Sequence, residues 1–273
     1  GGVGMGSRGP GETKIELDRR RINTRMAKLR KQIAAMKPAR ETKRANRTRN
    51  AVPAVAIAGY TNAGKSSLLN RITQAGVLVQ NALFATLDPT VRKAVTPDGR
   101  AYTLADTVGF VRNLPHQLVE AFRSSLEEIE SSDLVVHVVD ASHPDPAGQI
   151  ATVRNVIGEV GARNITELIV FNKIDLADDT HRMALRGMEP GSIGVSARTG
   201  EGIDELLARI ASLLPEPDIE VAAVIPYSRG DLVSRLHLNG RIIVLDYREA
   251  GTFVRAMVNP ELAAELAPFQ VIV

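Results

Sequence analysis

The sequence predicts an α/β protein: a mostly parallel sheet covered by helices, preceded by a long basic helical segment and followed by a small α+β domain. Three observations predict this class. Short apolar segments alternate with helical patterns in the middle of the chain, basic residues concentrate at its start, and strands return after a proline-rich linker. We therefore expect a glycine-rich junction and basic helix over residues 1–50, an α/β domain over 51–214 and a C-terminal domain over 215–273.

The first 50 residues form the basic part of the chain. They carry 15 Lys and Arg against four Asp and Glu, a net charge of +11, whereas the rest carries 19 basic and 27 acidic residues, a net charge of −8. A basic arm on an acidic body suggests contact with a polyanion such as nucleic acid. A solvated charged helix is the alternative interpretation.

Apolar residues recur every seven positions within this basic arm. The spacing predicts a helix over residues 12–37 with the narrow apolar stripe that is typical of coiled coils. The stripe consists of Ile15, Ile22, Leu29 and Met36, with Met26 and Ile33 between the later members. Pro38 interrupts it. Such a stripe needs a partner helix, which we expect either upstream or within residues 39–50.

The glycines before this helix match the pattern G-x-G-x-x-G from Gly4 to Gly9. A dinucleotide site with this pattern needs a strand before it, a βαβ unit around it and an acidic residue about 20 positions later. No strand is predicted before Gly4, and the basic "LRKQ" at residues 29–32 stands where the acid belongs. We interpret these glycines as a flexible junction.

The middle of the chain alternates between two kinds of pattern. Nearly continuous apolar segments predict strands at residues 54–59, 101–106, 134–140, 168–172 and 192–197. Helical patterns lie near residues 65–74, 117–131, 146–160 and 201–214. His137 lies inside one predicted strand, and we interpret it as a core residue and not as a metal ligand.

The C-terminal part begins after the linker "LPEPD" at residues 214–218. Its patterns follow the order β-α-β-β-α-β, which is typical of a small ferredoxin-like domain, and "FQVIV" at residues 269–273 would be its last strand. This part contains no motif that carries chemistry.

The strongest motif is "GYTNAGKSS" at residues 59–67, which satisfies G-x-x-x-x-G-K-[ST] between a predicted strand and a predicted helix. Its glycines permit a tight loop whose N–H groups surround phosphates, and the helix N-terminus adds its dipole. Lys65 would supply charge to the β- and γ-phosphates, and the Ser66 hydroxyl would ligate Mg²⁺. The predicted nucleotide contacts are Gly59, Tyr60, Thr61, Asn62, Ala63, Gly64, Lys65, Ser66 and Ser67.

A second motif selects the base. "NKID" at residues 172–175 ends a predicted strand, where a base-binding loop belongs. The Asp175 carboxylate can accept hydrogen bonds from N1–H and the 2-amino group of guanine, a donor pair that adenine lacks. Asn172 and Lys173 would brace the loop and cover the base, with Ile174 between them and Asp175. The backbone of Ser196, Ala197 and Arg198 is placed to reach guanine O6.

Two further segments would sense the γ-phosphate. "DTVG" at residues 106–109 ends a strand: Asp106 can hold Mg²⁺ through water, Gly109 N–H can bond the γ-phosphate, and Thr107 and Val108 complete the motif. A group bound only while that phosphate is present makes a switch. "LFATLDPT" at residues 83–90 offers Thr86 and Thr90 as candidate Mg²⁺ ligands by spacing.

These motifs together resemble the HflX family of ribosome-associated GTPases. "GYTNAGKSS", "LFATLDPT", "DTVGFVRNLP", "NKID" and "VSA" match its P-loop GTPase domain, and "RGPGETKIELDRR" is similar to the glycine-rich segment and long helix before that domain. The resemblance favours Thr86 over Thr90 as the metal ligand. The family segment around it covers Phe84, Ala85, Thr86, Leu87 and Asp88.

The resemblance also implies a function. It implies a molecular switch that binds Mg²⁺ with GTP or GDP and hydrolyses GTP. Its partner would be the large (50S) ribosomal subunit with its rRNA, in ribosome splitting, rescue or assembly. Full-length family members carry a further N-terminal domain. Because the first residue is glycine and not methionine, we expect this chain to be a piece of a longer protein.

The residue that would orient the attacking water is not identified by the sequence. Many small GTPases have Gln directly after the "DxxG" glycine, but Phe110 stands there and cannot hydrogen-bond water through its side chain. We therefore expect slow intrinsic turnover that a partner stimulates, and the resemblance implies that the ribosome is that partner. Arg112 and His116 follow closely and are weaker candidates for a direct role.

Other classes remain as alternatives. A signalling or membrane-associated G protein could place the basic arm on anionic lipid, but the apolar stripe is narrow and has neither Trp nor Phe. A P-loop kinase or ATPase is opposed by "NKID". The chain has no cysteine, no apolar run of membrane length and no signal peptide. We expect a cytoplasmic monomer without stable membrane association.

Overall fold

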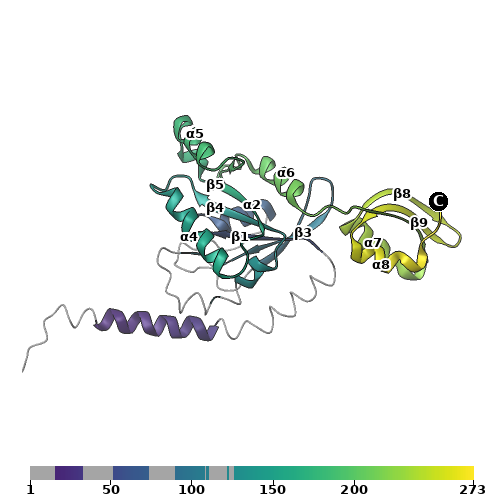
Figure 1. Cartoon of the computed structure of the whole chain (residues 1–273), viewed down its shortest axis with the longest axis horizontal. Helices are drawn as coiled ribbons and strands as arrows, with labels where there is room; N and C mark the ends of the chain where they lie inside the picture. Colours follow the sequence, from purple (N-terminus) through teal and green to yellow (C-terminus); the bar gives the residue numbers. More distant parts are fainter. Residues whose placement is uncertain (1–15, 33–51, 74–89, 108, 111–121, 123–125) are drawn as a thin grey trace, which may run out of the picture.

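The computed structural model of the protein describes residues 16–32, 52–73, 90–107, 109–110, 122 and 126–273 (Figure 1). Two sheets are present in this part of the chain, one with six strands and one with three. The larger sheet has the order β2-β3-β1-β4-β5-β6, and every neighbouring pair is parallel except β2 and β3. Its strands are β1 (Ala54–Gly59), β2 (Thr90–Val95), β3 (Ala101–Asp106), β4 (Leu134–Asp140), β5 (Thr166–Asn172) and β6 (Ile193–Gly194).

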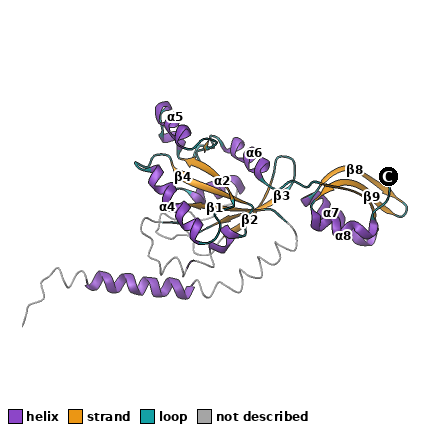
Figure 2. Ribbon diagram, viewed as in Figure 1, coloured by secondary structure: helices purple, strands orange, loops and turns teal. Residues whose placement is uncertain are grey.

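Helices cover both faces of this sheet (Figure 2), as the apolar strands predict. Alternate residues of β1 point to opposite faces: Val55 and Ile57 belong to one apolar cluster, and Ala56 and Ala58 to another. The first cluster also contains Leu68 of α2 and Leu206 of α6, and the second contains Val153 of α4. The helices are α2 (Lys65–Thr73), α4 (Pro146–Glu159), α5 (Asp179–Met188) and α6 (Ile203–Leu213).

The predicted strands and helices of this domain are largely confirmed, with three differences. The predicted strand over 192–197 is only two residues long, β6. Helix α5 and the antiparallel edge strand β2 were not predicted. Leu185 is the only buried residue of α5, so its buried apolar face is narrow. Helical residues 122 and 126–130 fall within the predicted 117–131.

The basic segment contains a helix over residues 16–32, within the predicted 12–37. Its apolar stripe meets the α/β domain: Leu29 is 2% exposed and belongs to the second-face cluster, with Met26 packed against it. Ile22 is 60% exposed. Leu29 and Met26 thus pack into a cluster that contains residues of the sheet, of α4 and of the helical residues 122, 126 and 129. The expectation of a partner helix upstream or within residues 39–50 falls outside the described residues and stays a prediction. Ile15, Ile33 and Met36 lie outside the described residues.

The C-terminal unit is joined through residues 214–218 and lies to one side of the larger sheet (Figure 1). Its sheet has the antiparallel order β7-β9-β8, with α7 and α8 packed against β7. Residues predicted as the last strand form a single bridge, Gln270 with Ala223, so the ferredoxin-like order is present with a shortened fourth strand. The elements are β7 (Ile219–Ile225), α7 (Gly230–Asn239), β8 (Arg241–Arg248), β9 (Gly251–Val258) and α8 (Pro260–Leu266).

Among the described helices, none combines the length and apolarity needed to cross a bilayer. His137 is fully buried in β4, as expected of a core residue.

Candidate nucleotide-binding site

Four parallel strands deliver the predicted site residues to one edge of the sheet. β1 ends at Gly59, β3 at Asp106, β4 at Asp140 and β5 at Asn172. Carboxyl ends of parallel strands are where ligands bind in open α/β sheets. The sheet therefore gathers the phosphate motif, the switch motif and the base motif, which are far apart in the chain.

The phosphate loop joins β1 to α2, and its backbone conformation is special. Asn62 has φ 66° and Gly64 has φ 92°, both left-handed. A Cβ on Gly64 would lie 2.3 Å from Asn172 Nδ2, and one on Gly59 would lie 2.4 Å from the Val138 carbonyl oxygen. Only glycine fits at either position. The loop leads into the N-terminus of α2, where backbone N–H groups and the helix dipole favour an anion.

Lys65 is buried at the start of α2, with 8% of its surface exposed. Burial lowers its pKa, while the nearby Asp106 charge acts in the opposite direction. A Cβ on Gly109 would lie 3.1 Å from Lys65 Nζ and 2.9 Å from Thr61 Oγ1, so these three residues meet at one point. A phosphate at this point would restore favourable charge around the buried ammonium.

Ser66 and Asp106 offer hard oxygen ligands side by side. The Ser66 hydroxyl donates to Asp106 Oδ2 at 2.8 Å. A hydroxyl and a carboxylate that face a phosphate site suit Mg²⁺, which prefers a few protein oxygens together with phosphate oxygens and water. The residues present therefore fit this cation.

The switch motif is tied to β1 and to the phosphate loop. The Thr107 hydroxyl donates to the Ile57 carbonyl at 2.7 Å, so this side chain anchors the switch motif to β1. Phe110 N donates to Gly59 O at 3.0 Å, and Thr61 N donates to Phe110 O at 2.7 Å. The Phe110 side chain is fully buried in the second-face cluster. It therefore faces the core and not the phosphate site.

The base motif is locked to the phosphate loop by Asn172, which is 2% exposed. Its Nδ2 donates to the Ala63 carbonyl at 3.0 Å, and its Oδ1 accepts from Ala197 N at 3.0 Å. Lys173, with φ 62°, donates from Nζ to the Asn62 carbonyl at 3.0 Å. The predicted bracing role of Asn172 and Lys173 has this geometric basis. Ser67 lies in the first turn of α2, directly after the loop.

Asp175 lies in the 3-10 turn η1 (Ile174–Leu176). Its carboxylate accepts from Arg198 Nη2 at 2.8 Å. This hydrogen bond, and a second from the Ser196 side chain, lower the pKa of Asp175. Arg198 therefore occupies the carboxylate that is predicted to read guanine. Ala197 N–H, a candidate donor to guanine O6, is donated to Asn172 in this arrangement.

Two positioning residues were not identified from the sequence. Arg71 of α2 donates to the carbonyls of Ala197, at 2.9 Å, and Arg198, at 2.7 Å. Asp140 accepts from Lys173 Nζ at 2.9 Å. Burial raises the pKa of Asp140, but hydrogen bonds from Ser142 and Lys173 outweigh burial and lower it. The position of Asp140 at the end of a predicted strand was a usable signal, whereas Arg71 gave none.

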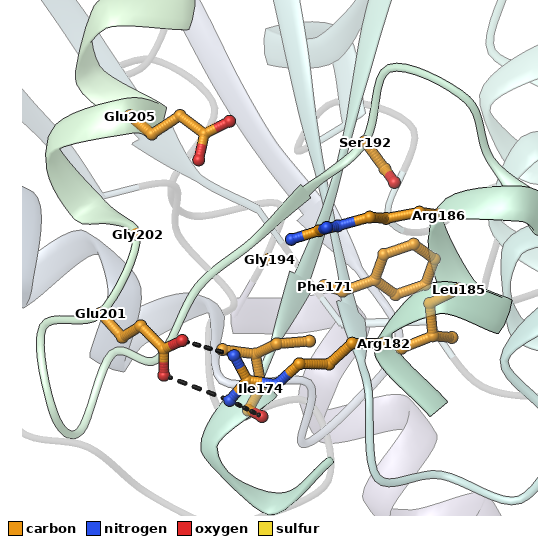
Figure 3. Close-up of a pocket in the computed structure, with 10 residues that line it drawn as sticks. All are labelled: Phe171, Ile174, Arg182, Leu185, Arg186, Ser192, Gly194, Glu201, Gly202 and Glu205. Carbon is orange, nitrogen blue, oxygen red and sulfur yellow. Dashed lines mark hydrogen bonds and ion pairs between the residues drawn. The ribbon is translucent and has the colours of Figure 1, made fainter. Parts of the chain in front are cut away.

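A cavity of about 220 Å³ lies behind the base turn, between α5 and α6 (Figure 3). Arg182 crosses it, donating to the Ile174 carbonyl at 2.8 Å and pairing with Glu201. Phosphate-loop residues do not line it. Arg182 and Glu201 therefore support the turn η1, which contains Asp175, and the cavity itself is separate from the nucleotide site.

Some predicted residues lie outside the described part of the chain. These are Phe84, Ala85, Thr86, Leu87, Asp88 and Val108, together with Arg112 and His116. Thr90, the alternative to Thr86, begins β2 and pairs in register with Asp106. The choice between the two threonines stays a prediction.

Comparison with known proteins bears directly on this site. The model of a family described as "50S ribosome-binding GTPase" matches residues 54–173, and that of the "GTP-binding GTPase Middle Region" matches residues 1–47. The fold is similar to a GTP-binding protein from Sulfolobus solfataricus solved in complex with GDP. That similarity has a TM-score of 0.50 and 26% identity, and covers 69% of this chain and 64% of that one.

Curated relatives extend the similarity over nearly the whole chain. A GTPase HflX from Lacrimispora saccharolytica is 44% identical over 97% of this chain and 63% of its own length. A GTPase HflX from Caldanaerobacter subterraneus is 42% identical over 98% of this chain and 61% of its own length. The chain thus spans about three fifths of the length of these relatives. With its phosphate, switch and base motifs gathered at one sheet edge, the chain belongs to the HflX family of GTPases.

Proposed function

We propose that this chain binds GTP and GDP, hydrolyses GTP and acts as a molecular switch. The observation that carries the proposal is Asn172, whose amide joins the phosphate loop at Ala63 to the base loop at Ala197. A buried residue that fixes the distance between these loops suits a ligand with both a phosphate chain and a base. The carboxylate of Asp175 beside it suits guanine.

Mg²⁺ would accompany the nucleotide. Ser66 would ligate it directly and Asp106 would hold it through water, while Thr86 is the proposed second side-chain ligand. The cation would neutralise charge on the β- and γ-phosphate oxygens. Lys65 would contribute a second positive charge.

Hydrolysis would be slow without a partner, because the Phe110 side chain is buried in the core and cannot orient water. The nucleotide proposal is tested by titrating fluorescent GDP and displacing it with GTP, GDP, ATP or ADP. We expect displacement by the guanine nucleotides alone. Equal displacement by ATP would contradict the proposal.

We propose the 50S ribosomal subunit as that partner, in the cytoplasm. The matched family description supports it, and so does the described helix over residues 16–32. This helix carries seven Lys and Arg residues and two acids, and every residue except Met26 and Leu29 is exposed. Exposed cations at this density suit the phosphates of rRNA.

The partner is tested by measuring the GTPase rate with and without purified 50S subunits, with anionic liposomes in a third arm. We expect stimulation by the subunits alone. Binding should weaken by about one log unit of affinity per log unit of salt for each phosphate contacted. Equal rates in all three arms would contradict the ribosome proposal but would leave the nucleotide proposal intact.

A further inference from the structure

The side chain that donates to the Asp175 carboxylate comes from Arg198, in the segment that is predicted to reach guanine O6. Arg198 Nη2 lies 2.8 Å from Asp175 Oδ2. The Arg198 side chain is 78% exposed, whereas that of Asp175 is 13% exposed. The guanidinium thus approaches the carboxylate from the solvent side.

The backbone beneath Arg198 is fixed. Arg71 holds the carbonyls of Ala197 and Arg198, and Ser196 Oγ accepts from Thr199 N at 3.1 Å. Because the backbone is anchored, Arg198 can leave Asp175 by rotating its side chain alone. An exposed side chain makes such a rotation within nanoseconds, so the contact is replaceable without refolding the loop.

Guanine and hypoxanthine make different demands on this carboxylate. Guanine offers two donors, N1–H and the 2-amino group, and a bidentate contact uses both carboxylate oxygens. Hypoxanthine offers N1–H alone and uses one oxygen. Arg198 contacts a single oxygen, Oδ2. Arg198 therefore competes more with a bidentate ligand, which needs both oxygens, than with a monodentate one, while the hydrogen bond from the Ser196 side chain is common to both cases.

We propose that Arg198 is a specificity-determining residue that competes with the guanine 2-amino group for Asp175. In the empty site Arg198 donates to the Asp175 carboxylate, and when guanine binds, the Arg198 side chain leaves Oδ2 so that the 2-amino group can donate to it. It thereby weakens guanine nucleotide binding and narrows the discrimination between guanine and hypoxanthine. The inference rests on the proposed guanine-nucleotide function and deepens it.

The expected effect is small, because exposed ion pairs contribute modest energies. Arg198→Ala should tighten GDP binding about two- to fivefold, the range for such pairs, with a slower GDP dissociation rate. Its affinity for IDP should stay within error of wild type. The GDP difference should shrink as salt is raised from about 0.05 M to about 0.5 M, because salt screens the pair.

Arg209→Ala is the matched control, since Arg209 is a half-buried arginine on α6 whose side chain donates to the Gly191 carbonyl, away from the base motif. It should leave both affinities unchanged, and thermal unfolding would verify that each variant is folded. An unchanged or weaker GDP affinity in Arg198→Ala would overturn the inference. Equal tightening of GDP and IDP, or an equal effect of Arg209→Ala, would overturn it too. If wild type binds no guanine nucleotide, the proposed function itself fails.

Discussion

The phosphate end and the base end of the site are built in different ways. At the phosphate end, glycine backbone, a left-handed loop and the buried Lys65 define the shape. At the base end, side chains and backbone groups from four separate segments hydrogen-bond to one another, and the Arg198 side chain is exposed to solvent. At the phosphate end, the lack of space around the glycines limits which residues are tolerated. At the base end, the shape of the site depends on hydrogen bonds that can be exchanged for others.

This difference separates affinity from selectivity. A rigid phosphate cradle would bind any nucleoside di- or triphosphate, because phosphates are common to all of them. The base end would decide which nucleotide is retained, and its hydrogen bonds can be changed one at a time. Substitutions should therefore act abruptly at the phosphate end and gradually at the base end.

The largest effect is expected from Gly64→Ala. The new Cβ would lie 2.3 Å from Asn172 Nδ2 at φ 92°, so the loop or Asn172 must move. Losing the two Asn172 hydrogen bonds should cost about 4 kcal/mol, about a thousandfold in GDP affinity. Gly99→Ala is the control: it has φ 93° with nothing near its Cβ, and it should cost stability but not affinity. GDP affinity is measured by calorimetry, and equal values in wild type and Gly64→Ala would contradict the idea that lack of space defines the phosphate end.

Asp175→Asn should act next most strongly, and selectively. An amide offers one acceptor and one donor, so one guanine donor would be left unpaired at a cost of about 2 to 3 kcal/mol, about a hundredfold in GDP affinity. Xanthine, with an acceptor in place of the 2-amino group, should gain. Competition between GDP and XDP measures both changes. The exposed Asp179→Asn serves as the control, and an unchanged preference in Asp175→Asn would remove this residue from base recognition.

Arg71→Met should have a moderate effect. It removes donors from the Ala197 and Arg198 carbonyls, but water can replace them, so the loss should be about 1 kcal/mol, roughly fivefold in GDP affinity. Amide hydrogen exchange over residues 197–200 should accelerate. Arg209→Met is the matched control. Unaltered exchange in Arg71→Met would show that the base loop is held by other contacts.

The smallest effect is expected from Asp140→Asn, which breaks the ion pair with Lys173. Because the folded-state pKa of Asp140 lies below its ordinary value of 3.8, its contribution is present above that value and lost as pH falls through the folded pKa. We expect a two- to fivefold weaker GDP affinity, about the worth of an exposed pair, that is constant from about pH 5.5 to about pH 8. A wild-type to variant ratio that changes within this window would contradict the assignment.

The sequence predicted the site where a motif coincided with the end of an apolar strand. The phosphate loop and "NKID" each met this condition, so the sheet topology alone brings Gly64, Lys65 and Asn172 together. Arg71 could not be predicted, because its role depends on the distance between α2 and a loop 126 positions later. Neither the residue type nor its spacing encodes that distance.

The fold was predictable to the same extent. Elements with a wide apolar face, such as α4 and β4, were located within one or two residues. Helix α5 buries Leu185 alone, and its start is marked by the Asp178 cap, whose carboxylate accepts from His181 N, and not by a wide apolar face. Of the predicted heptad stripe, Leu29 and Met26 pack into the second-face cluster while Ile22 is exposed, and periodicity does not say what covers the packed residues.

The position of Leu29 has a thermodynamic consequence. Leu29 belongs to the basic helix, and Phe110 directly follows the glycine of the switch motif, yet both side chains fill one apolar cluster. Close-packed interiors transmit changes of volume, so a displacement of Phe110 would change the free energy with which the helix packs. Such a coupling would be reciprocal. A ligand that stabilises the packed helix would also stabilise the position of Phe110, and by the same free energy. A polyanion bound to the outer surface of the helix would thus affect the conformation of the phosphate loop without contacting it.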